Sequence, residues 1–164
     1  MEAGFDTVTP FECKTISSWA YDKAITKKDI KILDNRAIDV PCYHPGYTFV
    51  EKLQTIATKY RREQETGKPN VNFMRQYYDV YCLLESPLVQ SFIGTPEYQQ
   101  HKRERFPETD LAIPIAQNEA FILSNPEIRK KYTKRYQSTE ALHYRGQPSF
   151  DEVLKKIKGY FDKL

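Results

Sequence analysis

The stretch from Val40 to Leu84 constrains this chain most, because it places two charged residues inside otherwise apolar helical patterns. It reads VPCYHPGYTFVEKLQTIATKYRREQETGKPNVNFMRQYYDVYCLL. The pattern indicates a strand end, a tight turn, a helix, a polar loop and a second helix. Lys52 lies beside the apolar face of the first helix, and Asp79 lies in the tyrosine-rich run of the second. Charges at such places need a structural or a chemical explanation.

The limits of these two helices follow from local signals. Thr48 and Glu51 have the T-x-x-E spacing of a capping box, which predicts that the first helix starts there. We expect it to end at Arg61 and Arg62, where basic residues suit the negative end of the helix dipole. A loop over residues 63–70 follows, since this segment contains a glycine and a proline, and the second helix then runs to Leu84.

The N-terminal part of the chain favours short strands. We predict strands over residues 4–9, 11–16 and 37–43, with a short helical turn capped by Ser17 or Ser18 between the last two. Beyond Leu84, residues 86–94 read as an apolar connector. Further helices are expected after Thr95-Pro96 and Asn125-Pro126, and a last one after a second capping box, Ser149 with Glu152.

These elements define an α+β fold that is mostly helical. Residues 1–46 are predicted to hold the strands, and residues 47–164 a helical C-terminal bundle that forms one compact unit. The 164 residues are enough to bury a sizeable core.

Composition narrows the function classes. The net charge of +3 permits nucleic-acid binding without arguing for it. Cys13, Cys42 and Cys82 have no zinc or CxxC spacing, so we expect buried free thiols in a reducing compartment. The sequence shows no apolar run of membrane length and no signal peptide, and we therefore expect no membrane contact and a cytoplasmic protein. No metal site, glycine-rich phosphate loop or nucleophile motif is predicted.

Lys52 and Asp79 have ordinary structural interpretations. Lys52 could lie at the edge of a packed helix with its stem on apolar surface. Asp79 could form an i,i+4 pair with Arg75 on one helix face. Against this, aspartate is a poor residue for a helix interior, and Asp79 is flanked by Tyr78 and Val80 rather than by other charges. A buried aspartate needs partners.

The same stretch resembles a known family. The segments YTFVEKLQTIATKYRR and MRQYYDVYCLL resemble the third and fourth motifs of the AbiEii/AbiGii nucleotidyltransferase toxins of type IV toxin–antitoxin systems. The matching residues are Glu51-Lys52-Leu53 and residues 75–79, Arg-Gln-Tyr-Tyr-Asp. EAGFDTVTP and KTISSW are similar to late strands of the family's sheet, so that the resemblance covers most of the chain.

The resemblance implies transfer of a nucleotidyl group from an NTP to an acceptor such as RNA, with Mg²⁺ as the expected cofactor of the complete family protein. Lys52 would contact the triphosphate with Arg75 as a second nucleotide-binding residue, and Asp79 would act near the reacting hydroxyl or orient the site. An antitoxin is a possible partner. The chain lacks the family's G-G and D-x-D motifs, which carry the nucleotide cradle and the metal ligands. We therefore expect a C-terminal fragment that is inactive alone.

A second hypothesis is not enzymatic. The chain could be a helical interaction module that binds RNA or an antitoxin partner through its basic residues. The candidates are Arg61, Arg62, Lys102, Arg103, Arg105, Arg129, Lys130, Lys131, Lys134 and Arg135.

Overall fold

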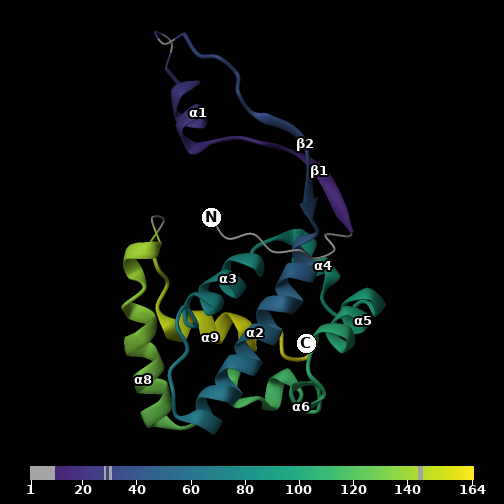
Figure 1. The fold of residues 1–164 in the computed structure, drawn as a ribbon, viewed down its shortest axis with the longest axis vertical. Helices are drawn as coiled ribbons and strands as arrows, with labels where there is room; N and C mark the ends of the chain where they lie inside the picture. Colours follow the sequence, from purple (N-terminus) through teal and green to yellow (C-terminus); the bar gives the residue numbers. More distant parts are fainter. Residues whose placement is uncertain (1–9, 28, 30, 144–145) are drawn as a thin grey trace. The chain divides into compact units, whose positions relative to one another are not determined.

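The computed structural model describes residues 10–27, 29, 31–143 and 146–164. It divides into an N-terminal unit, Met1–His44, and a helical unit, Pro45–Leu164. The predicted α+β, mostly helical fold is confirmed: a small antiparallel sheet comes first and helices follow (Figure 1). The strand predicted over residues 4–9 lies outside the described residues.

The N-terminal unit is built around one hairpin. Strand β1 (Phe11–Ile16) pairs antiparallel with strand β2 (Ala37–Tyr43), and helix α1 (Trp19–Ala24) lies between them in the sequence. Ser18 caps α1 by accepting a hydrogen bond from Tyr21 N–H at 3.0 Å. Both strands and the helical turn confirm the sequence prediction. The expectation of buried thiols is wrong, because Cys13 is exposed and Cys42 only half-buried in this unit, and Cys82 is exposed on the helical unit.

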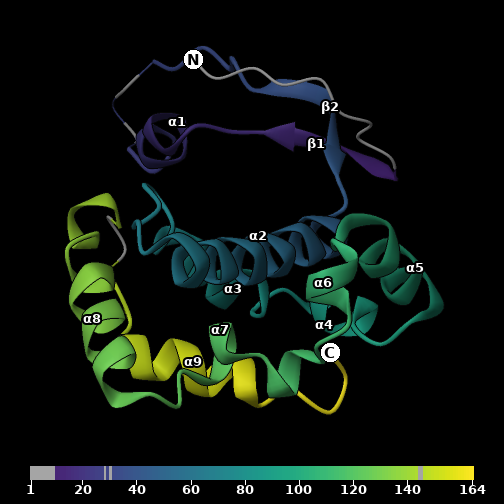
Figure 2. The same ribbon diagram turned by 60° about the horizontal axis from the view of Figure 1, so that its bottom comes forward.

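The helical unit surrounds the long helix α2 (Pro45–Thr66), which crosses it from end to end (Figure 2). The remaining helices are α3 (Arg75–Leu83), α4 (Pro87–Phe92), α5 (Pro96–Arg105), α6 (Glu108–Leu111), α7 (Glu119–Ile122), α8 (Pro126–Gln137) and α9 (Phe150–Lys158). Two 3₁₀ turns, Ile115–Gln117 and Glu140–Leu142, complete the unit. Helices α3 to α7 contact α2, and α9 packs against α3, α7 and α8.

The core follows from the periodic apolar positions of these helices. Phe49, Leu53 and Ile56 of α2 are fully buried against Tyr77 and Val80 of α3 and the residues around them. Tyr77 satisfies its hydroxyl by donating to the Ala120 carbonyl oxygen at 2.7 Å. A buried tyrosine with a partner for its hydroxyl keeps the full gain of ring burial.

Three sequence predictions about the helices are wrong. Helix α2 starts at Pro45 rather than Thr48, because proline suits the first helical turn, so Thr48 lies inside the helix and forms no cap. It continues to Thr66 rather than ending at Arg62, and Gly67, with φ of 67°, follows its end. Residues 86–94 contain α4 rather than a plain connector.

The later helix starts are confirmed. Thr95 accepts a hydrogen bond from Tyr98 N–H, Asn125 from Glu127 N–H, and Ser149 with Glu152 forms the predicted capping box. No described helix has both the length and the apolar character required to cross a membrane.

Candidate functional site

The structure brings Lys52 and Asp79 together. Lys52 Nζ lies 2.9 Å from Asp79 Oδ2 and donates a hydrogen bond of 2.9 Å to Gln76 Oε1. Helix α2 supplies the lysine, and α3 supplies both acceptors one turn apart. The Lys52 and Asp79 side chains are 30% and 37% exposed, so solvent reaches the pair.

Two more cations lie near this pair. Lys59 is seven residues after Lys52, about two helical turns, and therefore on the same face of α2. Burial lowers the pKa of Lys59, and the positive charges of Arg75 and Lys52 lower it further. Arg75 is exposed at the start of α3, one turn before Asp79. We call Lys52, Lys59, Arg75, Gln76 and Asp79 the α2–α3 charge cluster.

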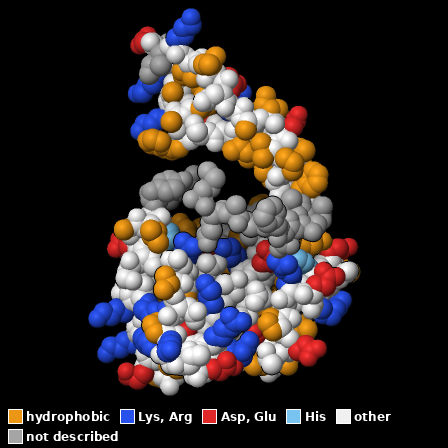
Figure 3. All heavy atoms as spheres, in the orientation of Figure 1, with side chains coloured by type: hydrophobic (Ala, Val, Ile, Leu, Met, Phe, Trp, Pro, Cys, Tyr) orange, Lys and Arg blue, Asp and Glu red, His pale blue; other side chains and the backbone are white. Residues whose placement is uncertain are grey.

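The cluster carries an excess of positive charge, three cations against one carboxylate. In the described part of the chain, Asp79 pairs with Lys52 and forms no ion pair with Arg75. Neither Lys59 nor Arg75 has an acidic partner within 4.0 Å among these residues. Figure 3 shows Lys and Arg side chains over α2 and α3 on the face turned to the viewer, with Asp and Glu mainly toward the edges. Such a surface suits a polyanionic ligand.

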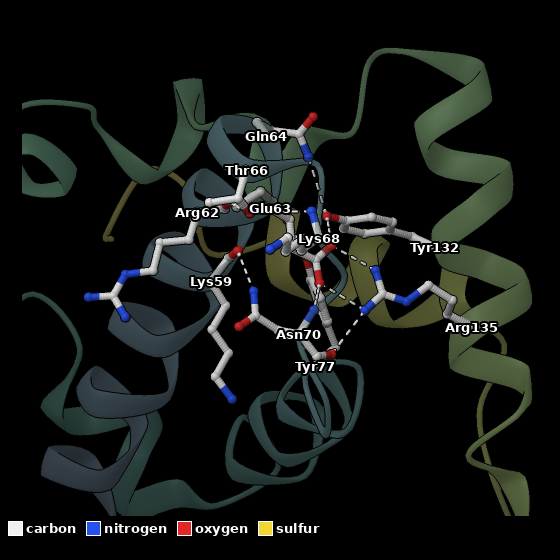
Figure 4. A network of polar contacts seen from close by, with 11 residues as sticks. Lys59, Arg62, Glu63, Gln64, Thr66, Lys68, Asn70, Tyr77, Tyr132 and Arg135 are labelled. Carbon is white, nitrogen blue, oxygen red and sulfur yellow. Dashed lines mark hydrogen bonds and ion pairs between the residues drawn. The ribbon is translucent and has the colours of Figure 1, made fainter.

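A second charged group lies near the other end of α2, and its character is different. Glu63 accepts hydrogen bonds from Arg135 Nη1 and Nη2 at 2.7 and 2.8 Å, and from Tyr132 Oη at 2.7 Å. Asn70 N–H donates to the same carboxylate at 2.6 Å. Figure 4 shows Tyr132 and Arg135 reaching from α8 toward Glu63. We call these four residues the Glu63 network.

The Glu63 network positions the loop that leads into α3. Arg135 also donates to the Asn70 carbonyl oxygen at 3.2 Å, and the Asn70 side chain donates to the Lys59 carbonyl oxygen at 3.3 Å. The loop over residues 67–74 is thereby tied to both α2 and α8. Since Arg75 and Gln76 come directly after this loop, the network fixes where they meet α2.

The structure sorts the ten basic candidates of the interaction-module hypothesis. Five of them bind within the chain. Arg61 pairs with Asp110 at 2.7 Å, Arg105 with Glu51 at 3.2 Å and Arg135 with Glu63 at 2.7 Å, and the buried Lys102 donates to the Leu164 main-chain oxygen. Arg129 forms an ion pair with Asp151 at 2.7 Å. The candidates that are exposed and form no ion pair with a described residue are Arg62, Arg103, Lys130, Lys131 and Lys134.

The described residues do not by themselves fit a magnesium site. No three His, Cys, Asp or Glu side chains among them gather where they could hold one metal ion. The single carboxylate of the α2–α3 charge cluster is already paired with Lys52. Since Mg²⁺ prefers several oxygen ligands, no chemical step at this cluster is assigned to a metal held by these residues.

A family model describes the same chain. The model described as "Nucleotidyl transferase AbiEii toxin, Type IV TA system" matches residues 1–156. The chain belongs to the AbiEii family. This confirms the resemblance carried by residues 51–53 and 75–79, and it places the chain among the toxins of type IV toxin–antitoxin systems. No curated protein and no solved structure matches this AbiEii family member.

Sequence reasoning identified three residues of the cluster, Lys52, Arg75 and Asp79, and missed Lys59 and Gln76. The signal for Lys59 was present, because a spacing of seven places two residues on one helix face. Gln76 lies between Arg75 and Tyr77 within the motif itself. What the sequence could not show is that its amide faces Lys52.

Proposed function

We propose that the α2–α3 charge cluster binds the triphosphate of a nucleoside triphosphate, in transfer of the nucleotidyl group to an acceptor such as RNA. The observation that carries this proposal is the hydrogen-bonding state of Lys52. Its ammonium group has three N–H donors, of which Asp79 and Gln76 accept two. No other described residue accepts the third, which is therefore available to a phosphate oxygen.

Each side chain has a role that its geometry supports. Gln76 and Asp79 hold the Lys52 ammonium group in one place, so that little of its conformational freedom is lost when a phosphate binds. Lys59 and Arg75 add positive charge nearby and, with Lys52, neutralise the triphosphate. Arginine can contact phosphate through two N–H groups, whereas lysine acts as a point charge.

The reaction expected for the family is a substitution at phosphorus. An acceptor hydroxyl oxygen forms a bond to the α-phosphorus, the bond from that phosphorus to the β-phosphate oxygen breaks, and pyrophosphate leaves. The hydroxyl proton passes to a carboxylate or to water. Asp79 is the carboxylate of the cluster, and 37% of its side chain is open to solvent, where an acceptor can approach.

The experiment measures NTP binding to the 164-residue chain by calorimetry, with and without Mg²⁺. We expect Lys52→Ala and Arg75→Ala each to weaken binding by roughly tenfold, which corresponds to about 1.4 kcal/mol. Arg62→Ala is the matched control, because Arg62 is an exposed cation of the same helix outside the cluster. Its affinity should stay within about twofold of the wild type.

The Mg²⁺ comparison tests the charge argument. Because the cluster is cationic and has one carboxylate, we propose that the triphosphate binds it without needing Mg²⁺, although the complete family enzyme is expected to use the metal for transfer. The proposal fails if NTP does not bind, or if Lys52→Ala and Arg75→Ala bind NTP as tightly as Arg62→Ala. Transfer activity that survives Lys52→Ala and Asp79→Ala together would contradict the roles proposed for these two residues.

A further inference from the structure

Helices α8 and α9 frame two adjoining hollows on the helical unit. The smaller, of about 300 Å³, has an apolar floor that includes Phe121, Leu154 and Phe161. The larger, of about 600 Å³, lies along α8 and is lined almost entirely by polar and charged side chains. Arg129 and Asp151 line both hollows, so the two adjoin at this ion pair, and we call them together the α8–α9 groove.

The groove is rich in cations. Lys130 and Lys134 of α8 line the larger hollow, and Lys155 and Lys158 of α9 line the smaller. All four lysines are exposed, and none of them forms an ion pair with another described residue. Asp151 is the one acid among the described lining residues, and Arg129 pairs with it at 2.7 Å. Four positive charges along the groove therefore have no acidic partner among the described residues.

We propose that the α8–α9 groove binds the acceptor RNA through its phosphate backbone. This inference rests on the proposed function in taking RNA as the acceptor. A row of lysines along an open groove is how proteins track a single-stranded backbone, and a ring in the wall gives bases a surface on which to stack. Phe161 is half-buried in the lining of the smaller hollow and supplies such a ring.

The composition of the larger hollow favours RNA over an acidic polypeptide. Protein partners are anchored mainly by apolar or aromatic side chains that enter well-packed pockets. The larger hollow is lined by Pro126, Arg129, Lys130, Thr133, Lys134, Gln137 and Asp151, of which only proline is apolar. Charged and hydroxyl or amide side chains of that kind contact phosphate and sugar groups well. Figure 3 shows Lys and Arg side chains over α8 on the face in view.

The test is binding of a short fluorescein-labelled single-stranded RNA, followed by anisotropy over a range of salt concentrations. We expect Lys130→Glu/Lys134→Glu and Lys155→Glu/Lys158→Glu each to weaken binding by roughly tenfold or more. Each variant should also lower the slope of log affinity against log salt by about 1.4, since a single strand contributes about 0.7 per phosphate contact. The slope separates lost contacts from a folding defect, which would reduce the amount of active protein instead.

Arg62→Glu/Arg103→Glu is the matched control, because it makes the same charge change at two exposed residues of the helical unit that lie outside the groove lining. It should keep RNA affinity within about threefold of the wild type. The inference is overturned if the groove variants bind RNA like this control, or if polyglutamate competes with the RNA as well as unlabelled RNA does.

NTP binding by the same samples separates this inference from the proposed function. The groove variants should bind NTP as the wild type does, because the α2–α3 charge cluster shares no residue with the groove. RNA binding that depends on the groove in a chain that fails to bind NTP would support the groove and end the proposed function. RNA binding that is lost in Lys52→Ala but kept in both groove variants would overturn the groove.

Discussion

Helix α2 contributes to two charged groups of opposite character. In the Glu63 network, the side chains of Glu63 and Arg135 are 4% and 21% exposed, and four hydrogen bonds from three residues reach one carboxylate. In the α2–α3 charge cluster, Lys52 and Asp79 are about a third exposed, and two further cations lack an acidic partner among the described residues. The charges of the Glu63 network are paired with each other, whereas the α2–α3 charge cluster has a surplus of positive charge among the described residues.

This difference separates charges that stabilise the fold from charges that stay open to solvent. A buried carboxylate that accepts several hydrogen bonds keeps no capacity for a ligand, and its loss damages the fold. A solvent-facing cluster with surplus charge contributes little to folding, and its unpaired donors can bind a ligand.

Removing the carboxylate of the Glu63 network should have the largest effect on stability. Glu63→Leu leaves Arg135 without its counter-charge, and Tyr132 Oη and Asn70 N–H without their acceptor. We expect a loss of about 3 kcal/mol in the free energy of unfolding, the lower end for a broken buried pair, because Arg135 is 21% exposed. Urea denaturation measures it.

The double variant Glu63→Leu/Arg135→Leu is the control for this prediction. If the damage comes from the unpaired charge of Arg135, the double variant should recover part of the loss, since apolar pairs often replace buried ion pairs at little cost. A double variant less stable than Glu63→Leu would contradict this account, as would a loss below about 1 kcal/mol in the single variant.

The Glu63 network should also make the free energy of unfolding depend on pH in the acidic range. Burial alone would raise the pKa of Glu63, but hydrogen bonds from Arg135, Asn70 N–H and Tyr132 outweigh it and hold the pKa below 4.5. A carboxyl whose pKa is lower in the folded state stabilises the fold above its unfolded pKa, and this contribution is lost as pH falls through the folded value. Comparison of the wild type with Glu63→Gln by thermal unfolding isolates the contribution.

The expected result is a difference in unfolding free energy that is constant above about pH 4.5 and shrinks as the pH is lowered further. Glu152 is a check on this result, because its pKa is also lowered, by hydrogen bonds from the Ser149 side chain and N–H at an exposed helix cap. Glu152→Gln should show a weaker dependence. Equal pH profiles for the two variants would contradict the claim that the buried hydrogen bonds of Glu63 contribute more to the pH dependence than those of Glu152.

The fold could be predicted where signals are local and not where partners are distant. The strands over residues 11–16 and 37–43 and the starts of α5, α8 and α9 follow from alternation, proline and capping residues, and all are confirmed. The end of α2 was predicted wrongly because residues 63–66 are polar and resemble a loop. Glu63 is instead a buried helix residue, and its partner Arg135 is 72 positions away, which no local pattern reveals.

The candidate site shows the same limit. Lys52 and Asp79 stand out in the sequence because each interrupts an apolar pattern, and the structure places their charged atoms 2.9 Å apart. Their 27-residue separation includes a loop whose path depends on the Glu63 network. The sequence could therefore name the two residues but could not supply the contact, nor show that Lys59 and Gln76 belong with them.

The smallest effect on stability is expected at Asp79. Asp79→Asn removes the ion pair with Lys52 but keeps an oxygen that can accept its hydrogen bond, and the pair is about a third exposed. We therefore expect the free energy of unfolding to change by less than about 1 kcal/mol. A loss above about 2 kcal/mol would assign this pair to the structural class of the Glu63 network.

The same variant separates stability from binding. If Lys52 and Asp79 form only a structural pair, Asp79→Asn should leave NTP binding unaffected, just as Lys52→Ala should. If the cluster binds triphosphate, removing its one carboxylate increases the local positive charge, so Asp79→Asn should bind NTP as tightly as the wild type or up to a few-fold more tightly. Lys52→Ala should bind it more weakly, as above. Weaker NTP binding by Lys52→Ala but not by Asp79→Asn, at nearly unchanged stability, would show that this pair acts on a ligand rather than on the fold.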